Sequence, residues 1–165
     1  MTAGMYLGEI TRLVLLDLII KKALFSGKSS TELSTVNGFE TAYMSRIERD
    51  HSFDLIDTKI ILEDLLNVPR TTLEDRNLVK VVCQLVGTRS ARLAACGVAA
   101  IVTKIGRIHG CVVAIDGSLF EHYPHFANRM RDALREVLGL MSQQIVLESA
   151  RDGSGLGAAV IAALA

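Results

Sequence analysis

The feature that most constrains this sequence is a long apolar segment without proline, residues 78–105. Residues 71–74 (TTLE) precede it and match the capping box that starts many helices. Apolar residues recur through the segment at helical spacing, so we expect one helix about 50 Å long at 1.5 Å per residue. Gly87 and Gly97 lie inside it, and such isolated glycines usually indicate close packing against a neighbouring element.

The sequence before this segment is also typical of helices. Residues 5–25 are apolar on most sides, which predicts one helix buried on several faces and ended by the Ser- and Gly-rich residues 26–30. Thr41 is expected to be the N-cap of a short helix that reaches Arg49. Residues 54–67 predict a further helix, which Pro69 prevents from continuing. The first two thirds of the chain are therefore expected to be helical.

The pattern changes at Cys111. Two short apolar runs rich in β-branched residues, 112–115 and 145–147, predict buried strands. Pro124 is typical of the first turn of a helix, which we expect to continue to Leu138, and a last helix is expected over residues 158–164. The final third thus reads as strand–helix–strand–helix. No repeat or linker divides the chain, so we predict an α/β protein with a single domain over residues 1–165.

Composition excludes several classes of function. Half of the 165 residues are hydrophobic and 22% are charged, as in a folded globular protein. The formal net charge is zero and no basic stripe occurs, so we expect no nucleic-acid partner. The three cysteines form no C-x-x-C pair, which argues against a disulfide framework or a zinc site and favours the reducing cytoplasm. The apolar run at residues 13–20 is too short to span a bilayer, so no membrane partner is expected.

Two turns follow the predicted strands, and each has a functional and a structural interpretation. The glycines of residues 153–157 could hold an anion on helix amides, could be part of a dinucleotide fingerprint, or could simply allow close packing. The fingerprint also requires a further strand and an acidic residue about 20 positions later, which these 165 residues do not contain. Asp116, Gly117 and Ser118 could present backbone and a hydroxyl to a nucleotide beyond a strand end, or could form an ordinary Asp-Gly turn.

Other candidate chemistry is weak. His122 and His125 flank Pro124 without a third ligand nearby, so we predict no metal site. No G-x-S-x-G sequence indicates a serine nucleophile. The charged residues 46–50 are most simply a solvated helix face with ion pairs at helical spacing. We therefore predict no catalytic residue from these patterns.

Five segments, in the same order, resemble those of the hexokinase family. They are residues 4–13 (GMYLGEITRL), 38–48, 88–91, 113–124 and 148–159. Together they cover essentially the whole chain. Residues 41–50 (TAYMSRIERD) are similar to fungal rather than animal members.

This resemblance implies ATP-dependent phosphorylation of a hexose at its 6-hydroxyl, with ATP and magnesium as cofactors. It also implies an actin/Hsp70-like (ribonuclease H-like) core, of which residues 1–165 would be a partial domain, the C-terminal portion of the large lobe. The resemblance implies that Gly4 and Met5 lie on the nucleotide side of the cleft, and that Thr41 and Ser45 reach the nucleotide from a helix start. It implies that the adenosine is lined by Gly117, Ser118 and Leu119.

Other family motifs have no counterpart in this sequence. The D-L-G-G-T phosphate loop, the second Gly-Thr-Gly loop, the sugar-binding segment and the general-base Asp are absent, as are the acidic residues that organise magnesium. We therefore expect no catalytic residue, hexose binding only with the missing N-terminal part, and no activity of this chain alone. The alternative is a non-catalytic module that binds ATP or ADP weakly or assembles with a partner. Unpaired strand edges would favour self-association.

Overall fold

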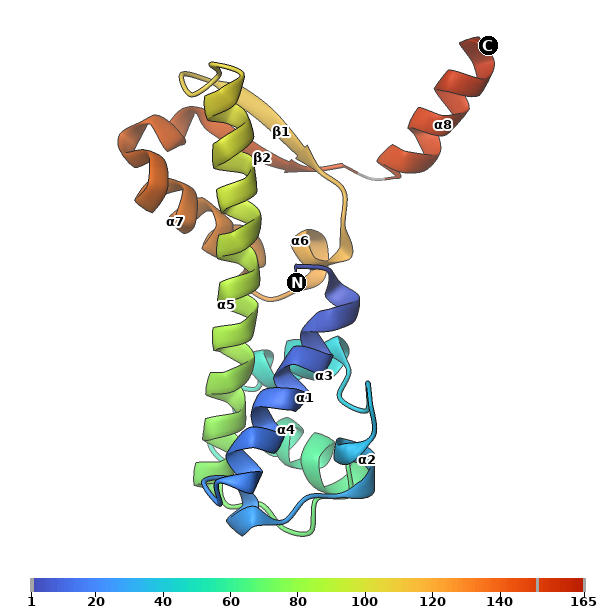
Figure 1. Ribbon diagram of the computed structural model, residues 1–165, viewed down its shortest axis with the longest axis vertical. Helices are drawn as coiled ribbons and strands as arrows, with labels where there is room; N and C mark the ends of the chain where they lie inside the picture. The colour runs from blue at the N-terminus through green and yellow to red at the C-terminus, as the bar shows by residue number, and fades with distance from the viewer. Residues whose placement is uncertain (1, 151, 165) are drawn as a thin grey trace. The chain divides into compact units, whose positions relative to one another are not determined.

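The computed structural model describes residues 2–150 and 152–164. The chain divides into two compact units, Met1–Ser90 and Ala91–Ala165, and α5 contributes residues to both (Figure 1). Helices dominate, and the strands form a small parallel sheet, so the predicted α/β class is confirmed.

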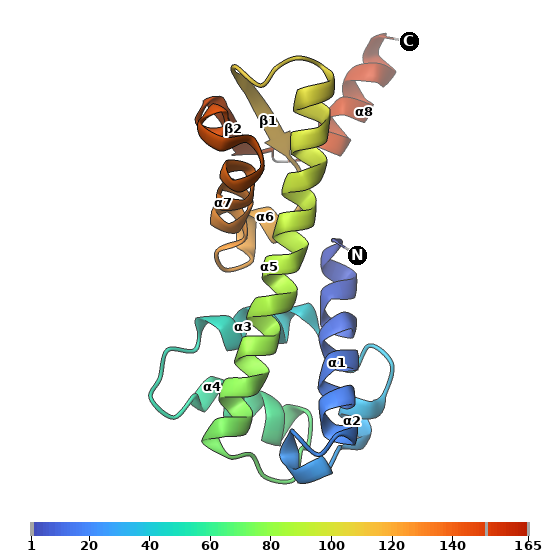
Figure 2. The ribbon, with the colours of Figure 1, turned by 60° about the vertical axis from the view of Figure 1, so that its left-hand side comes forward.

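The first unit is helical. Its elements are α1 (Gly4–Ile20), η1 (Phe25–Gly27), α2 (Thr31–Ser34), α3 (Thr41–Arg49), α4 (Ile56–Ile60), η2 (Ile61–Leu65, π-helical) and the beginning of α5 (Leu73–Lys104). The helices α1 to α4 surround the first part of α5 (Figure 2). Large apolar side chains fill the centre between them, among them Leu7, Leu15, Leu33, Phe39, Met44, Ile47, Ile61 and Leu62.

The helix predicted over residues 5–25 is shorter than expected. It ends at Ile20 because Lys22, Phe25 and Ser26 adopt left-handed backbone angles, with φ of 58°, 50° and 51°. A left-handed residue interrupts the helical hydrogen-bond pattern and turns the chain. The helix predicted over residues 54–67 is also not a regular α-helix throughout, because α4 continues into the π-helical turn η2.

The burial expected for this first helix is only partly correct. Leu7 and Leu15 are fully buried, but Met5, Leu13 and Ile20 are more than half exposed. One side of α1 therefore packs in the unit, while the other carries apolar side chains to the surface.

The long helix α5 matches the prediction in type and length, but its cap is displaced. The Thr72 hydroxyl accepts a hydrogen bond from Asp75 N at 3.1 Å, and the Asp75 carboxylate accepts one from Thr72 N at 3.0 Å. Thr71 instead donates to Glu63, from N at 2.7 Å and from Oγ1 at 2.6 Å. The capping box predicted at residues 71–74 is therefore wrong by one position.

The expectation of close packing at both glycines of α5 is wrong for Gly97. A Cβ atom placed there would meet no atom within 4 Å. By length and composition alone α5 could cross a membrane, with an 18-residue window of mean hydropathy 1.4 that is 39% buried within the protein. A single helix of this kind is equally typical of the core of a soluble protein.

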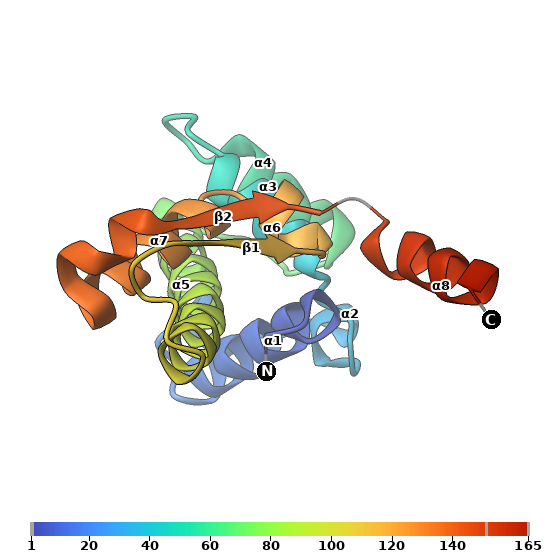
Figure 3. The ribbon, with the colours of Figure 1, turned by 90° about the horizontal axis from the view of Figure 1, so that it is seen from above.

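The second unit combines the end of α5 with the sheet. Its further elements are β1 (Cys111–Ile115), α6 (Ser118–His122), α7 (Phe126–Leu138), η3 (Gly139–Gln144), β2 (Ile145–Ser149) and α8 (Gly153–Leu164). The strands β1 and β2 are parallel, with Cys111 opposite Ile145 and Ile115 opposite Ser149, and they run side by side in Figure 3. Both strands occur where predicted, but they are only half buried: Leu147 is 5% exposed, whereas Val112 is 63% exposed.

Two predicted helix starts are wrong. Pro124 precedes α7 rather than lying in its first turn, because His125, with φ of 59°, is the residue before the helix. The glycine-rich residues 153–157 are not a turn but the first residues of α8.

Candidate functional site

In the first unit, the start of α3 is joined to α1 by a single hydroxyl group. Thr41 Oγ1 accepts a hydrogen bond from Gly8 N at 2.9 Å and donates one to Gly4 O at 2.5 Å. A Cβ atom at Gly8 would lie 2.2 Å from Phe39 O, so only glycine allows this approach. The prediction that Thr41 is an N-cap is wrong, since Glu40 is the N-cap and Thr41 is the first helical residue.

A cavity of about 430 Å³ opens beside this junction, and we name it the α1–α3 cavity. Its lining residues are Gly4, Met5, Tyr6, Glu9, Asn37, Phe39, Glu40, Thr41 and Ala42. The fold thus brings together three residues that sequence reasoning assigned to nucleotide binding, namely Gly4, Met5 and Thr41. Ser45 is half buried one turn further along α3 and is not part of the lining.

The charges of the α1–α3 cavity do not by themselves attract an anion. The Glu9 carboxylate accepts hydrogen bonds from Arg12 at 2.6 and 2.7 Å and from Asn37 N at 2.8 Å. The hydrogen bond from Arg12, with a smaller contribution from Asn37, lowers the pKa of Glu9 below its ordinary value despite partial burial. Glu40 adds a second carboxylate, and no Lys or Arg is among the lining residues. A phosphate here would depend on the free N–H groups at the start of α3.

Arg12 explains why this corner of the unit is well defined. Its side chain is 5% exposed, and besides Glu9 it donates to Leu33 O at 3.2 Å and to Ser34 O at 3.1 Å. The buried guanidinium therefore joins α1 to α2 and holds Glu9, which lines the cavity. Sequence reasoning missed this role of Arg12, which depends on contacts 21 and 22 residues away.

In the second unit, the predicted nucleotide turn follows the carboxyl end of β1. We name residues 116–119 the β1 turn. Gly117 and Ser118 are exposed, and Leu119 is half buried at the start of α6. The hydrogen bonding between β1 and β2 extends one residue beyond β2, with a bond from Ala150 N to Ile115 O at 2.9 Å. The turn therefore stands at the edge of a parallel strand pair where ligands commonly bind.

The start of α8 lies at the same edge, but its chemistry disfavours an anion. A Cβ atom at Gly155 would lie 2.5 Å from an Asp152 carboxylate oxygen, and one at Gly153 would lie 3.4 Å from Asp116 Oδ2. Two carboxylates thus lie beside the first residues of α8, where their charge would repel a phosphate. The space that Gly155 leaves for Asp152 supports the interpretation that these glycines serve packing.

The predicted site residues therefore fall into two groups, one in each unit. Gly4, Met5 and Thr41, with Ser45 nearby, belong to the first unit, whereas Gly117, Ser118 and Leu119 belong to the second. Within residues 2–150 and 152–164, no group of three or more His, Cys, Asp or Glu side chains could hold a metal ion. The described residues thus offer no ready-made cluster of acidic ligands for magnesium.

Sequence reasoning missed the structural importance of Gly8, although a signal was present. Gly4 and Gly8 are one helical turn apart in an otherwise apolar helix. Such a pair marks a face that another backbone can approach, as the segment before α3 does here.

Comparisons with known proteins extend over the whole chain. The model of the family described as Hexokinase matches residues 1–164. Hexokinase-1 of Schizosaccharomyces pombe is 41% identical over 165 residues, and Hexokinase-1 of Saccharomyces cerevisiae is 43% identical over 168. Hexokinase-2 of rice (Oryza sativa subsp. japonica) is 42% identical over 168 residues. These alignments cover 98–99% of this chain, which spans about a third (34%) of the length of each relative.

Solved structures agree with these relatives. A hexokinase from Schistosoma mansoni complexed with glucose superposes with a TM-score of 0.89 at 37% identity, over 99% of this chain and 37% of that one. A second hexokinase crystal structure gives a TM-score of 0.78 at 25% identity, over 92% of this chain and 33% of that one. From the family match, the relatives and the shared fold, it follows that this chain belongs to the hexokinase family and corresponds to its C-terminal part.

Proposed function

We propose that this chain carries the adenosine-side part of the nucleotide site of an ATP-dependent hexose 6-phosphotransferase. The observation that carries the proposal is the exposed Gly117–Ser118 pair at the carboxyl end of β1 in a member of the hexokinase family. Gly117 lacks a side chain, so a flat purine can approach the backbone closely. The Ser118 hydroxyl is available to a ribose, and the half-buried Leu119 offers apolar contact.

The family resemblance assigns further nucleotide-side residues to the first unit. Glu40, Thr41 and Ala42 at the start of α3 line the α1–α3 cavity, and a helix N-terminus favours phosphate oxygens. Gly4 and Met5 would border the nucleotide from α1, and Ser45 would lie one turn along α3. In this proposal both units belong to one partial domain, the C-terminal portion of the hexokinase large lobe.

The proposed chain binds nucleotide but does not catalyse phosphoryl transfer alone. The transfer requires groups that position the phosphates, the metal and the attacking hydroxyl. This sequence contains no D-L-G-G-T or Gly-Thr-Gly loop, and its acidic side chains form no metal cluster in the described part of the chain. Magnesium, hexose binding and the general base would come from other hexokinase segments. The three free cysteines fit a cytoplasmic protein.

The alternative is a non-catalytic module that assembles with a partner. It is supported by exposed apolar side chains on the sheet and on α8, such as Val112, Val146, Leu156 and Ile161. Exposed apolar side chains favour association, including self-association, where they gather into a patch.

The nucleotide site is tested by titrating ADP while following backbone amide signals. With only part of the site present, ADP should bind with a dissociation constant in the high-micromolar to millimolar range, a binding free energy of about 4–6 kcal/mol. Signals of Gly117, Ser118, Thr41 and Ser45 should shift with ADP, and magnesium should change this little. Ser118→Tyr should abolish the shifts, whereas the control Ser29→Tyr, at an exposed serine of the other unit, should not. Shifts confined to residues 153–157 would contradict the placement of the nucleotide.

A further inference from the structure

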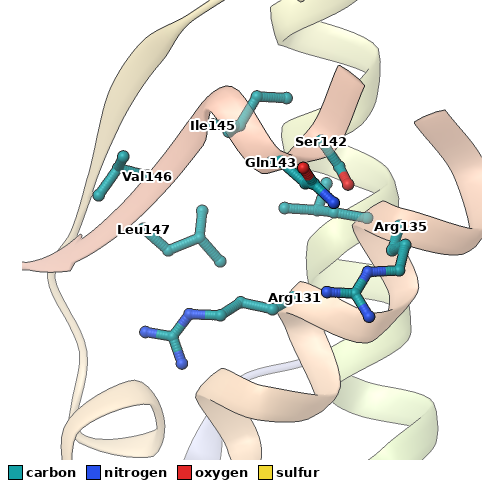
Figure 4. A pocket seen from close by; sticks show the side chains of 8 residues that line it. Arg131, Arg135, Ser142, Gln143, Ile145, Val146 and Leu147 are labelled. Carbon is teal, nitrogen blue, oxygen red and sulfur yellow. The ribbon is translucent and has the colours of Figure 1, made fainter. Parts of the chain in front are cut away.

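The second unit contains another cavity, with a volume of about 260 Å³, between α7, η3 and β2. We name it the arginine cavity. Figure 4 shows the residues that line it: Arg131, Leu134, Arg135, Ser142, Gln143, Ile145, Val146 and Leu147. It lies at the amino end of β2, whereas the β1 turn follows the carboxyl end of β1. Because the strands are parallel and in register, the cavity, which reaches from Ile145 to Leu147, and the turn after Ile115 lie toward opposite ends of the sheet.

Two guanidinium groups dominate this cavity. Arg131 and Arg135 are four residues apart on α7 and project from the same side of the helix (Figure 4). Arg131 Nη1 donates to Asn128 Oδ1 at 3.0 Å, which holds that guanidinium in one orientation and leaves its other donors available. Among residues 2–150 and 152–164, the Arg135 guanidinium makes no hydrogen bond or ion pair.

No carboxylate neutralises this pair within the cavity. None of the lining residues is acidic. Glu136 is engaged by Arg92 at 2.5 and 2.9 Å. Glu148 lies on the opposite face of β2 from Leu147, by strand alternation. Asp132 is three residues from Arg135 on α7, but it does not line the cavity, and no ion pair joins the two within residues 2–150 and 152–164. Two like charges one turn apart disfavour a helix, so this arrangement is best satisfied by an anion from outside the chain.

We propose that the arginine cavity binds the phosphate group of a small phosphate monoester. Guanidinium groups present parallel N–H donors that match the oxygens of a phosphate, and two of them can hold one group from two sides. The Gln143 amide adds a further donor at the rim. Ile145 and Leu147 form an apolar wall, which suits a short organic part of the ester. This site goes beyond the proposed nucleotide site and requires none of its residues.

A purely structural role for Arg135 gives a different expectation. It lies in the last turn of α7, where a cation is favoured by the helix dipole. In that case its replacement would lower stability, and no anion would bind. Binding measurements on the full chain separate the two interpretations.

The experiment follows the side-chain Nε–H signals of arginine and the side-chain amide of Gln143 in the 165-residue chain. The probes are inorganic phosphate, phenyl phosphate and acetate at equal ionic strength. We expect saturable shifts of Arg131 and Arg135 with both phosphates, with dissociation constants on the order of 1 mM. Phenyl phosphate should bind more tightly than inorganic phosphate because of the apolar wall. Acetate, with two oxygens, should bind more weakly than either phosphate.

Substitutions make the test specific. Arg131→Gln or Arg135→Gln should each weaken phosphate binding about tenfold, and the double variant should abolish it. Arg107→Gln removes an equal charge from an exposed position of the same unit outside the cavity and should leave binding unchanged. Unchanged backbone spectra would show that each variant is folded. The proposal is overturned if phosphate causes no saturable shift or if acetate binds as tightly as phosphate. It is also overturned if Arg107→Gln weakens phosphate binding as much as the cavity variants do.

An ADP titration keeps this proposal separate from the nucleotide site. Saturating phosphate should leave the ADP-induced shift of Ser118 unchanged, because the two places lie at opposite ends of the sheet. If ADP does not bind at all, the phosphate shifts at Arg131 and Arg135 remain the expected result. If phosphate instead abolishes the ADP shifts, the two ligands share one site and the proposal is wrong.

Discussion

Gly8 is the residue at which α1 meets the backbone of the segment before α3. Its missing side chain allows the backbone of Phe39 to Thr41 to touch α1, and the Thr41 hydroxyl then satisfies groups on both sides of the contact. The position of three candidate site residues thus depends on a residue that binds nothing itself. A long-range contact of this kind could not be predicted from local sequence, because Thr41 and Gly4 are 37 residues apart.

Replacing Gly8 with alanine should therefore destabilise the protein. The added Cβ would overlap backbone atoms, which cannot move aside as a flexible side chain can. We expect Gly8→Ala to lower the free energy of unfolding by about 1–3 kcal/mol in urea denaturation. Gly97→Ala is the matched control, since a Cβ there meets nothing within 4 Å, and it should be neutral or stabilising by about 0.5–1 kcal/mol. Equal effects of the two substitutions would disprove the close contact.

Asp50 links the stability of the first unit to pH. Its carboxylate is 5% exposed and accepts hydrogen bonds from Ser52 Oγ at 2.6 Å, Thr58 N at 2.8 Å and Thr58 Oγ1 at 2.9 Å. Burial alone would raise the pKa of Asp50, but the hydrogen bonds from Ser52 and Thr58 outweigh it and lower the pKa below its ordinary value of 3.8. The folded state therefore favours the ionised form. This contribution to stability is present above the unfolded pKa and is lost as the pH falls through the lower folded pKa.

The substitution Asp50→Asn tests whether ionised Asp50 stabilises the folded protein and whether this stabilisation is lost at low pH. At pH 7 we expect the variant to be less stable than the parent by about 1–3 kcal/mol, because donors that faced a carboxylate are left poorly paired. The difference should narrow as the pH falls below about 3.8, since the parent then loses its own ionised carboxylate. Urea denaturation at pH 7 and at pH 3 measures the gap. The exposed Asp64→Asn serves as control, and a gap for Asp50→Asn that stays constant with pH would contradict the account.

At the scale of elements, the sequence predicts what periodicity and composition control. The helices α5 and α7 and the strands β1 and β2 occur near their predicted positions because their patterns are long or strongly β-branched. The end of α1 was not predictable, since Lys22, Phe25 and Ser26 are residue types that rarely adopt left-handed angles. The half-exposed strands were not predictable either, because burial depends on what covers each face of the sheet. The β1 turn was predictable, since a strand followed by Asp-Gly-Ser is a local signal.

The displaced cap of α5 gives a prediction at this scale. Thr72, not Thr71, supplies the oxygen that accepts a hydrogen bond from the first turn. Thr72→Ala should therefore lower the free energy of unfolding by about 0.5–2 kcal/mol, whereas Thr72→Ser keeps the hydroxyl and should change it little. Thermal or urea denaturation compares the two. If alanine and serine at position 72 are equally stable, the cap does not contribute as described.

At the scale of the whole molecule, the chain consists of two compact units, and each contains some of the residues proposed to contact a nucleotide. It spans about a third of the length of its hexokinase relatives, and other family motifs of phosphoryl transfer have no counterpart in its sequence. In the function proposed above, the chain contributes to nucleotide binding and would support phosphoryl transfer only together with the remaining hexokinase segments.

The most direct measurement is glucose phosphorylation by a chimera in which this chain replaces the matching third of S. pombe Hexokinase-1. The account predicts turnover near the typical enzyme value of about 10 s⁻¹ for the chimera and none for this chain alone. It also predicts that Ser118→Tyr in the chimera raises the KM for ATP at least tenfold while the KM for glucose stays unchanged. A folded chimera that binds glucose without phosphorylating it, or a Ser118→Tyr variant with an unaltered KM for ATP, would contradict the proposal.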